Sequence, residues 1–168
     1  ERALSAFGLT INSDYDLIDG IWADRPAIPK NEFRPQPVEY SGEETKARTQ
    51  RILEHLKKKG ANATVLTTLD ELAWAFNIRN CDVECNPVGV GFGFIGGKES
   101  VLFTFAEKVN AALQSELQAQ GVRVMGYQEI FGYLSVLPAS VTVYVDKSRI
   151  SSAVYNALAP HCRQIEGV

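Results

Sequence analysis

The sequence predicts an α/β fold in which a mixed β-sheet of about five to six strands is flanked by helices. Short runs of β-branched and aromatic residues alternate along the chain with segments of helical periodicity. Two of these runs stand on either side of Gly96 and Gly97, a pair able to adopt the positive φ angles of a tight antiparallel hairpin. The 168 residues, 45% of them hydrophobic, are enough for one domain with a substantial core.

The first helix of this domain is expected to begin at a capping box formed by Ser41 and Glu44. It presents Ile52 and Leu56 on one face and ends at Gly60, which suits a left-handed helix stop. The three lysines just before this glycine match the negative end of the helix dipole. A phosphate or lipid site is the alternative interpretation of the lysines.

The rest of the domain is expected to alternate strands and helices. A second capping box, Thr68 with Glu71, is expected to open a helix directly after the first strand. Strands 88–95 and 101–105 form the predicted hairpin. The other expected elements are strand 63–67, helix 69–76, helix 106–120 ended by Gly121, strand 122–125, helix 129–137, strand 141–145 and helix 150–158.

The chain is expected to divide into three parts. Residues 1–11 are interpreted as the tail of an upstream domain, residues 12–40 as a junction segment and residues 41–168 as the α/β domain. The junction holds four prolines and few periodic apolar positions, as extended linkers do. Its own apolar side chains are expected to rest on a neighbouring surface: Leu17, Ile18, Ile21 and Trp22.

Charge and cysteine content argue against several classes of partner. Seventeen basic against twenty acidic residues give a net charge of −3 and a pI near 5.4, so the chain lacks the strong basic balance of nucleic-acid-binding proteins. The longest apolar run, residues 88–95, is too short and too rich in glycine to cross a membrane. Three cysteines suit no disulfide framework and predict free thiols in a cytoplasmic protein.

Gly91, Gly93 and Gly96 match the spacing of a dinucleotide-binding fingerprint. That fingerprint needs a helix N-terminus after its glycines to hold a pyrophosphate. Here the glycines fall inside a predicted strand that is followed by a hairpin. Close packing of the backbone is therefore preferred over nucleotide binding.

The residues give only weak support for a metal site. The spacing of the first two cysteines is atypical for zinc, and the only nearby histidine is adjacent to the third cysteine. Burial of the thiols is the preferred interpretation. The residues of this rejected zinc site are Cys81, Cys85, His161 and Cys162.

Hydrolytic catalysis is no better supported. His55 lies on the lysine-rich helix with no nucleophile expected near it. Asp82 and Glu84 would point to the same side of an extended segment, and nothing there sets one of them apart as a general acid. The sequence thus predicts no catalytic residue, metal ligand or cofactor within this chain.

Two stretches resemble one family of enzymes. Residues 16–29 read DLIDGIWADRPAIP, and residues 65–88 read VLTTLDELAWAFNIRNCDVECNPV. Both are similar to segments of the cytosolic, three-domain Xaa-Pro aminopeptidases (aminopeptidase P), the first at the junction of the first and middle domains and the second in the middle domain. The likeness continues more loosely from residue 105 to residue 158.

The resemblance implies a creatinase-N-terminal-like α/β domain that precedes a catalytic pita-bread domain. The family removes an N-terminal residue that precedes proline, using two divalent metal ions, typically manganese. Its metal ligands all belong to the pita-bread domain, which is expected to be absent from this chain. The implied partners are the chain's own N-terminal and C-terminal domains, a peptide with proline in second position, and a homodimer formed through the absent domain.

Two functions from different classes follow from this resemblance. The first is a non-catalytic middle domain that helps to shape substrate access and inter-domain packing. The second is a stand-alone peptide- or protein-binding domain, because related aminopeptidase-like folds that lost catalysis serve as interaction domains. The presence or absence of metal-ligand motifs in the parent reading frame would separate the two.

Candidate residues for the substrate cleft or an inter-domain contact are Asp70, Trp74, Arg79 and Asp82, where the resemblance is densest. They follow the first strand of the sheet, and open α/β sheets present functional loops at that end. Trp74 and Phe76 are expected to face the core. Arg79 is expected to pair with Asp82 and hold the following turn, with projection toward a catalytic cleft as the alternative.

The interpretation of the glycine fingerprint as strand packing can be tested by thermal melting. Adding NAD or ATP is expected to leave the melting temperature unchanged, whereas a ligand at about 100 times its dissociation constant would add roughly 2.7 kcal/mol of stability. A rise of several degrees with either nucleotide would contradict this interpretation.

Overall fold

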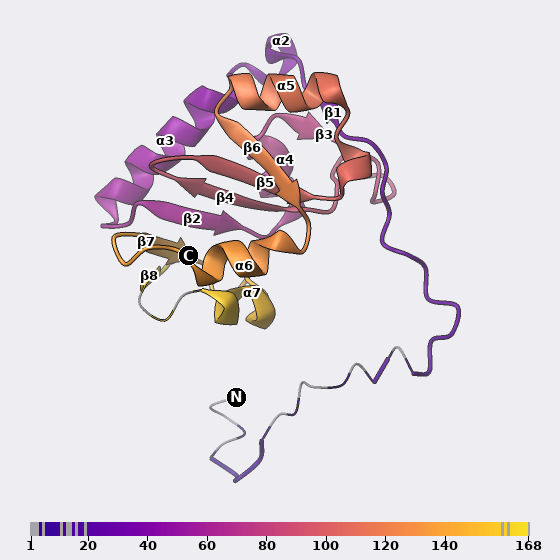
Figure 1. The fold of residues 1–168 in the computed structure, drawn as a ribbon, viewed down its shortest axis with the longest axis vertical. Helices are drawn as coiled ribbons and strands as arrows, with labels where there is room; N and C mark the ends of the chain where they lie inside the picture. Colours follow the sequence, from indigo (N-terminus) through magenta and orange to yellow (C-terminus); the bar gives the residue numbers. More distant parts are fainter. Residues whose placement is uncertain are drawn as a thin grey trace.

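The computed structural model describes residues 4, 6–10, 12, 15, 17–18, 20–158, 160 and 162–167. Its centre is a six-stranded sheet in the order β6-β5-β4-β2-β7-β8, which confirms the predicted mixed α/β architecture (Figure 1). Pairs β2–β4 and β4–β5 are antiparallel, and the other three neighbouring pairs are parallel. The strands are β2 (Ala63–Leu66), β4 (Phe92–Gly96), β5 (Ser100–Thr104), β6 (Val122–Gly126), β7 (Thr142–Val145) and β8 (Arg163–Glu166).

Helices cover both faces of this sheet because its central strands alternate large apolar side chains between the two faces. Phe94 and Ile95 are neighbours in β4, yet they belong to two different core clusters. Ile95 shares its cluster with residues of α3 (Thr45–Lys58), α4 (Leu69–Ala75) and α5 (Ala111–Ala119). Phe94 shares its cluster with residues of α6 (Glu129–Ser135) and α7 (Ser152–Ala157). The result is a three-layer arrangement with an apolar core on each side of the sheet.

The predicted hairpin is present, but its turn differs from the expectation. Strands β4 and β5 pair with Phe92 opposite Phe103 and Ile95 opposite Ser100. Neither Gly96 nor Gly97 has the positive φ angle that was expected of a tight turn. The chain instead turns through the residues between the two strands, and the amide of Gly96 donates to the carbonyl of Glu99 at 3.0 Å.

The two capping boxes predicted from the sequence are not formed as expected. Helix α3 begins at Thr45 after Glu44, because a separate short helix, α2 (Val38–Ser41), ends in a left-handed Gly42. Ser41 therefore does not cap α3. Helix α4 begins after Thr68 as predicted, although the hydroxyl of Thr68 bonds none of the helix amides.

The predicted helix 106–120 is in fact two helical pieces. A short 3₁₀ turn, η1 (Ala106–Lys108), precedes α5, and Asn110 separates them. The Asn110 side chain accepts a hydrogen bond from the amide of Leu113 at 2.9 Å, so it is the N-cap of α5. Gly121 ends this region with a φ of 80°, as its position predicted.

Three short strands were not predicted. Strand β8 extends the sheet beside β7, and β1 (Arg34–Pro35) pairs with β3 (Ile78–Arg79) in a separate two-stranded sheet. Phe33, just before β1, is only 1% exposed and belongs to the core around α4. The end of the segment interpreted as a junction thus packs on the domain, because one aromatic side chain anchors it.

Residues 20–32 run outside the packed layers as an extended segment (Figure 1). Its large apolar side chains are exposed, including Ile21 at 81% and Trp22 at 47%. Leu17 and Ile18 are exposed as well, so within the described residues this segment is not covered by the domain. No helix among the described residues has the length and apolar content needed to span a membrane.

The cap of α5 gives a direct test of this helix boundary. Asn110→Ala is expected to destabilise the fold by about 1 kcal/mol, because the amide of Leu113 loses its acceptor. In a chain of this size the melting temperature should fall by roughly 2–4 °C. Asn110→Ser is the control, since serine also caps helices well. Equal melting of both variants and the parent would contradict the assigned cap.

Candidate functional site

A buried ion pair joins Lys108 to Asp82, and neither side chain is exposed to solvent. One carboxylate oxygen of Asp82 accepts bonds from the ammonium of Lys108 and from the amide of Val90, the latter at 2.7 Å. The other oxygen accepts from the backbone amide and the side-chain amide of Asn31, both at 3.2 Å. The carboxylate thus connects three segments that are far apart in the sequence.

The same pair fixes the segment before β1. The amide of Phe33 donates to the carbonyl of Lys108 at 2.8 Å, and the ammonium of Lys108 lies 4.8 Å from the centre of the Phe33 ring. Asn80 adds a bond from its side chain to the carbonyl of Asn31 at 2.7 Å. Gly89 lies so close that a Cβ there would be 2.6 Å from the Phe33 ring and 2.7 Å from Asn80, so only glycine fits.

Burial lowers the pKa of Lys108, and the adjacent Asp82 carboxylate opposes that shift. A charged pair that is this well bonded holds its segments in one arrangement, although its net stabilisation is small compared with a hydrophobic contact. Removing one partner would leave the other charge buried without compensation. We therefore interpret the pair as structural.

Asp70 and Trp74 lie one turn apart on α4 and share its outer face. Both are exposed, Trp74 to 41%, so the expectation that Trp74 belongs to the core is wrong. Phe76, in contrast, is buried as predicted. The pKa of Asp70 is lowered, first by the hydroxyl of Thr68 and further by the start of the helix and by Arg149.

Two arginines of α3 cover the ring of Trp74. The guanidinium carbons of Arg48 and Arg51 lie 4.9 and 5.3 Å from the ring centre. Arg48 is buried and donates to the carbonyls of Trp74 and Ser41 at 2.6 Å each. Arg51 is exposed and pairs with Glu43 at 2.6 Å. The indole is thus held in place while one part of it stays open to solvent.

Arg79 is a third arginine near this cluster, but it makes different contacts from those expected. It donates to the carbonyls of Ala73 and Ile78, both at 2.9 Å, and so closes the end of α4 onto β3. No ion pair joins Arg79 to Asp82, although the structure describes both residues, because Lys108 occupies that carboxylate. The predicted Arg79–Asp82 pair is therefore wrong. The pKa of Arg48 is lowered mainly by its burial and further by Arg79 and Arg51, while Glu43 opposes the shift.

The structure brings three of the four candidate residues together and separates the fourth. Asp70, Trp74 and Arg79 lie on or beside α4, whereas Asp82 is enclosed by the loop that follows β3. Lys108 was not among the predicted site residues, because its partner Asp82 is 26 residues away in the sequence. Arg48 and Arg51 were not among them either, although their spacing of three residues indicates a shared helix face.

The glycine fingerprint is confirmed as strand packing. Gly93 and Gly96 lie in β4, and the next element is β5 rather than a helix. A Cβ on Gly93 would lie 3.1 Å from Leu72 and Phe76, and one on Gly91 would lie 3.0 Å from Leu72. These glycines let the helix α4 approach the sheet closely.

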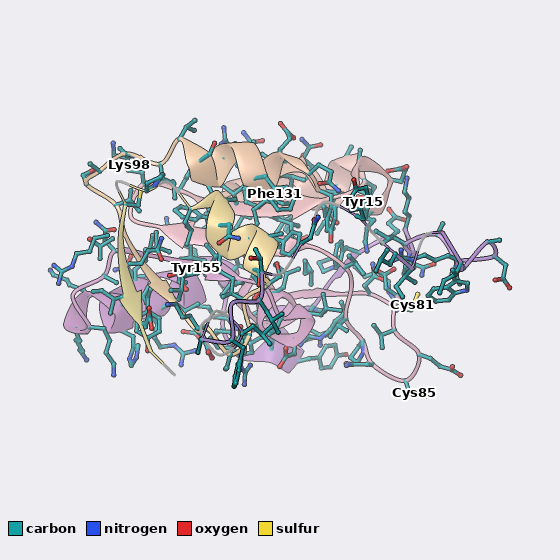
Figure 2. All side chains as sticks on the ribbon, turned by 90° about the horizontal axis from the view of Figure 1, so that it is seen from below. Tyr15, Cys81, Cys85, Lys98, Phe131 and Tyr155 are labelled. Carbon is teal, nitrogen blue, oxygen red and sulfur yellow. The ribbon has the colours of Figure 1, made fainter. Side chains whose placement is uncertain are left out.

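The cysteines are free, as predicted, but only Cys162 is buried. Burial raises the pKa of its thiol. Cys81 and Cys85 are exposed on a loop at one end of the molecule, which corrects the expectation that they are buried (Figure 2). His161 lies outside the described residues.

The described residues do not fit a metal centre or a carboxylate pair. No group of three His, Cys, Asp or Glu side chains among them is arranged to hold a metal ion. Glu84 is exposed while the carboxylate of Asp82 is enclosed, so the two do not point to the same side as expected. His55 is an exposed residue of α3.

The fold is that of a creatinase-like α/β domain. A family model described as Creatinase/Prolidase N-terminal domain matches residues 24–168, and the chain belongs to this family. It is 33% identical over 159 residues to a probable Xaa-Pro aminopeptidase P of Coprinopsis cinerea, covering 89% of this chain and 25% of that protein. A protein of the same description from Colletotrichum graminicola is 33% identical over 140 residues, covering 83% of this chain and 23% of the relative.

A solved structure of similar shape is the X-prolyl aminopeptidase of Caenorhabditis elegans, described as a cytosolic enzyme with a di-nuclear active site. The TM-score is 0.89 at 25% identity, and the match covers 98% of this chain and 28% of that chain. These findings confirm the resemblance to the Xaa-Pro aminopeptidase family, and the family model spans residues 65–88 and the later part of residues 16–29. The chain spans about a quarter of the length of the curated relatives it matches.

The role of the buried pair can be tested with Lys108→Met. The substitution is expected to lower the free energy of unfolding by about 3–5 kcal/mol, because the Asp82 carboxylate is left buried without its counter-charge. Denaturant unfolding measures the loss. Lys147→Met is the control, since its pair with Glu166 is exposed and is expected to contribute at most about 1 kcal/mol.

A second substitution completes this test. In Lys108→Met combined with Asp82→Asn, the uncompensated charge is gone, so the double variant should be less destabilised than the sum of the single variants by about 1 kcal/mol or more. Additive effects, or a Lys108→Met variant as stable as Lys147→Met, would show that the pair does not hold the three segments.

Proposed function

We propose that this chain is a non-catalytic middle domain of a metal-dependent Xaa-Pro aminopeptidase, where it helps to shape substrate access and inter-domain packing. The main support is the match of nearly the whole chain to about a quarter of proteins described as probable Xaa-Pro aminopeptidase P. Removal of an N-terminal residue before proline would then be the activity of the larger protein. This domain would contribute surfaces to it and no reacting group.

The proposal assigns the metal ions to a separate catalytic domain. Two divalent ions, manganese in the typical member, would be held there by ligands that this domain does not provide. The description of the Caenorhabditis elegans enzyme as cytosolic and di-nuclear supports this assignment and a cytoplasmic location. The partners of this chain would be the preceding domain and the catalytic domain of the same protein. A homodimer would form through the catalytic domain.

The outer face of α4 is the surface we propose for contact with the catalytic domain or the substrate cleft. Trp74 presents an exposed indole that two guanidinium groups hold in one orientation. Tryptophan and arginine are enriched in the residues that dominate interface energies, and an indole that is already ordered loses little entropy on binding. Asp70 adds a negative charge one turn away on the same face.

A stand-alone interaction domain is the alternative, because the same exposed face would serve to bind a peptide or protein. The experiment that separates the two functions is a chimera in which this chain replaces the equivalent quarter of the Coprinopsis cinerea relative. An active chimera supports the enzyme-domain role. A folded chimera that releases no N-terminal residue from Xaa-Pro peptides contradicts it.

The face of α4 can then be tested within the active chimera. Trp74→Ala is expected to lower kcat/KM about ten-fold, which corresponds to roughly 1.4 kcal/mol of transition-state binding, because the domain contact or cleft wall is lost. Val136→Ala is the control, since Val136 is also exposed and apolar but follows α6. The 168-residue chain alone is a second control and is expected to release no amino acid. Equal kcat/KM for both variants and the parent chimera would show that the outer face of α4 contacts neither the catalytic domain nor the substrate cleft.

A further inference from the structure

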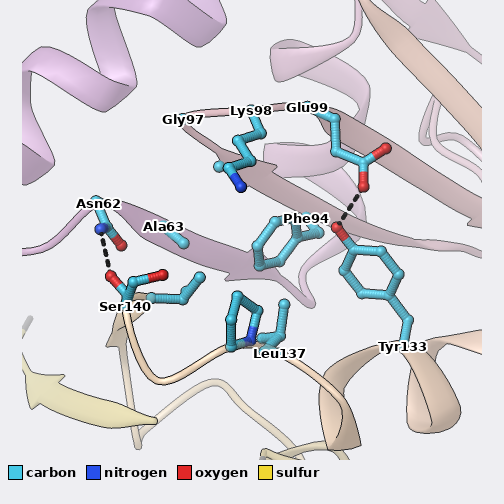
Figure 3. A pocket seen from close by; sticks show the side chains of 12 residues that line it. Asn62, Ala63, Phe94, Gly97, Lys98, Glu99, Tyr133, Leu137 and Ser140 are labelled. Carbon is cyan, nitrogen blue, oxygen red and sulfur yellow. Dashed lines mark hydrogen bonds between the residues drawn. The ribbon is translucent and has the colours of Figure 1, made fainter.

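A pocket of about 270 Å³ lies at the edge of the sheet where β4 ends and β2 begins. Its inner wall is apolar and is made by Ala63, Phe94, Leu137 and Val141 (Figure 3). Ala63, Phe94 and Leu137 are part of the core cluster under α6 and α7, so the wall is fixed by packing. This pocket is distinct from the face of α4 discussed above, because its lining comes from the hairpin and from the loop after α6.

The polar groups around the pocket are almost all occupied by one another. The side chain of Asn62 donates to the carbonyl of Ser140 at 2.9 Å and accepts from the amide of Thr142 at 2.8 Å. The hydroxyl of Tyr133 donates to Glu99 at 3.0 Å. Both side chains are therefore held in place by bonds to neighbouring groups of the protein.

The negative charge of Glu99 is compensated next to the pocket. Arg123 pairs with the Glu99 carboxylate at 3.2 Å and also lies over the ring of Tyr133 at 5.9 Å. Burial raises the pKa of Tyr133, and the neighbouring carboxylate raises it further, so the phenol stays a donor to Glu99. A second anion in the pocket would thus meet little repulsion from this carboxylate.

Lys98 is different from the other charged residues of the lining. It stands in the turn between β4 and β5, is exposed, and makes no ion pair within the described residues. Its ammonium is directed toward the space above Phe94 (Figure 3). Lys98 lies at the opposite end of the molecule from the loop with Cys81 and Cys85 (Figure 2).

We propose that this pocket binds a small apolar molecule that carries one carboxylate, with the apolar part against Phe94 and Leu137 and the carboxylate on Lys98. The apolar wall can bury the apolar part of the ligand without needing hydrogen bonds from it. The ammonium of Lys98 is the charged group of the lining that can pair with the carboxylate. The volume limits the ligand to a short chain or a single side chain. A medium-chain fatty acid and the C-terminal residue of an apolar peptide share this chemistry.

The test is an NMR titration of the ¹⁵N-labelled 168-residue chain with octanoate and, in parallel, with N-acetyl-leucine. We expect at least one of them to shift the amides of Gly97, Lys98 and Ser140 in a saturable manner. Octanol and N-acetyl-leucinamide are the uncharged controls and should bind up to about five-fold more weakly, because an exposed ion pair contributes up to about 1 kcal/mol.

Substitutions identify the group that holds the carboxylate. Lys98→Gln should weaken binding about five-fold, and Lys98→Arg should retain it. Lys57→Gln is the matched control, since Lys57 is an exposed lysine of α3 outside the pocket. Both positions are exposed and lie outside the core, so the three variants should melt like the parent.

Comparison of the two ligands shows whether the carboxylate comes from a fatty acid or from a peptide C-terminus. Tighter binding of octanoate assigns the pocket to fatty acids, and tighter binding of N-acetyl-leucine assigns it to peptide C-termini. The proposal is overturned if neither carboxylate shifts the pocket amides, or if the uncharged controls and the Lys98→Gln variant bind equally well. The aminopeptidase assignment does not depend on this outcome, because the titration measures binding to this chain alone.

Discussion

The arrangement of the domain depends on one enclosed carboxylate. Asp82 is the common acceptor for Lys108, Val90 and Asn31, and it thereby fixes the segment before β1, the loop after β3 and the turn after β5 against one another. A buried carboxylate with only one of these partners would be unstable, so all of the segments must be in place together. Gly89 belongs to the same constraint, because Phe33 lies where its side chain would be. The loop between β3 and β4 is consequently held by residues that lie before it and after it in the sequence.

This constraint also explains how the α4 face comes to be presented. Strand β3 follows α4 directly and pairs with β1, while Arg79 bonds the carbonyl of Ala73 near the end of α4. From the other side, Arg48 donates to the carbonyl of Trp74 and holds the helix against α3. The exposed indole of Trp74 therefore lies on a helix, α4, that is held by Arg79 of β3 and by Arg48 of α3. Such a rigid surface suits a domain whose role in a larger peptidase would be to position rather than to react.

The two ends of the sheet have different chemistry. At the end where β2 and β5 finish, charged groups are enclosed and satisfied by one another, as the Lys108–Asp82 pair shows. At the other end, the inner wall of the pocket is apolar, and Lys98 makes no ion pair with any residue that the structure describes. The antiparallel insertion of β4 between β2 and β5 produces this difference, because it brings the turn at residues 97–99 to the start of β2. One hairpin thus gives the domain a second concave surface remote from α4.

The sequence by itself determined the mixed α/β class, five of the six strands of the main sheet, the helix stops at Gly60 and Gly121, and the packing role of the glycines in β4. These are local properties, because periodicity and backbone freedom act within a few residues. Strands β1, β3 and β8 are too short or too polar to show a period, and pairing with a distant segment creates them. The partner of Asp82 is also determined by the tertiary structure. Arg79 is nearer in sequence, but Lys108 follows β5, and only the folded sheet brings its ammonium to the carboxylate while Arg79 is directed to the carbonyls of α4 and β3.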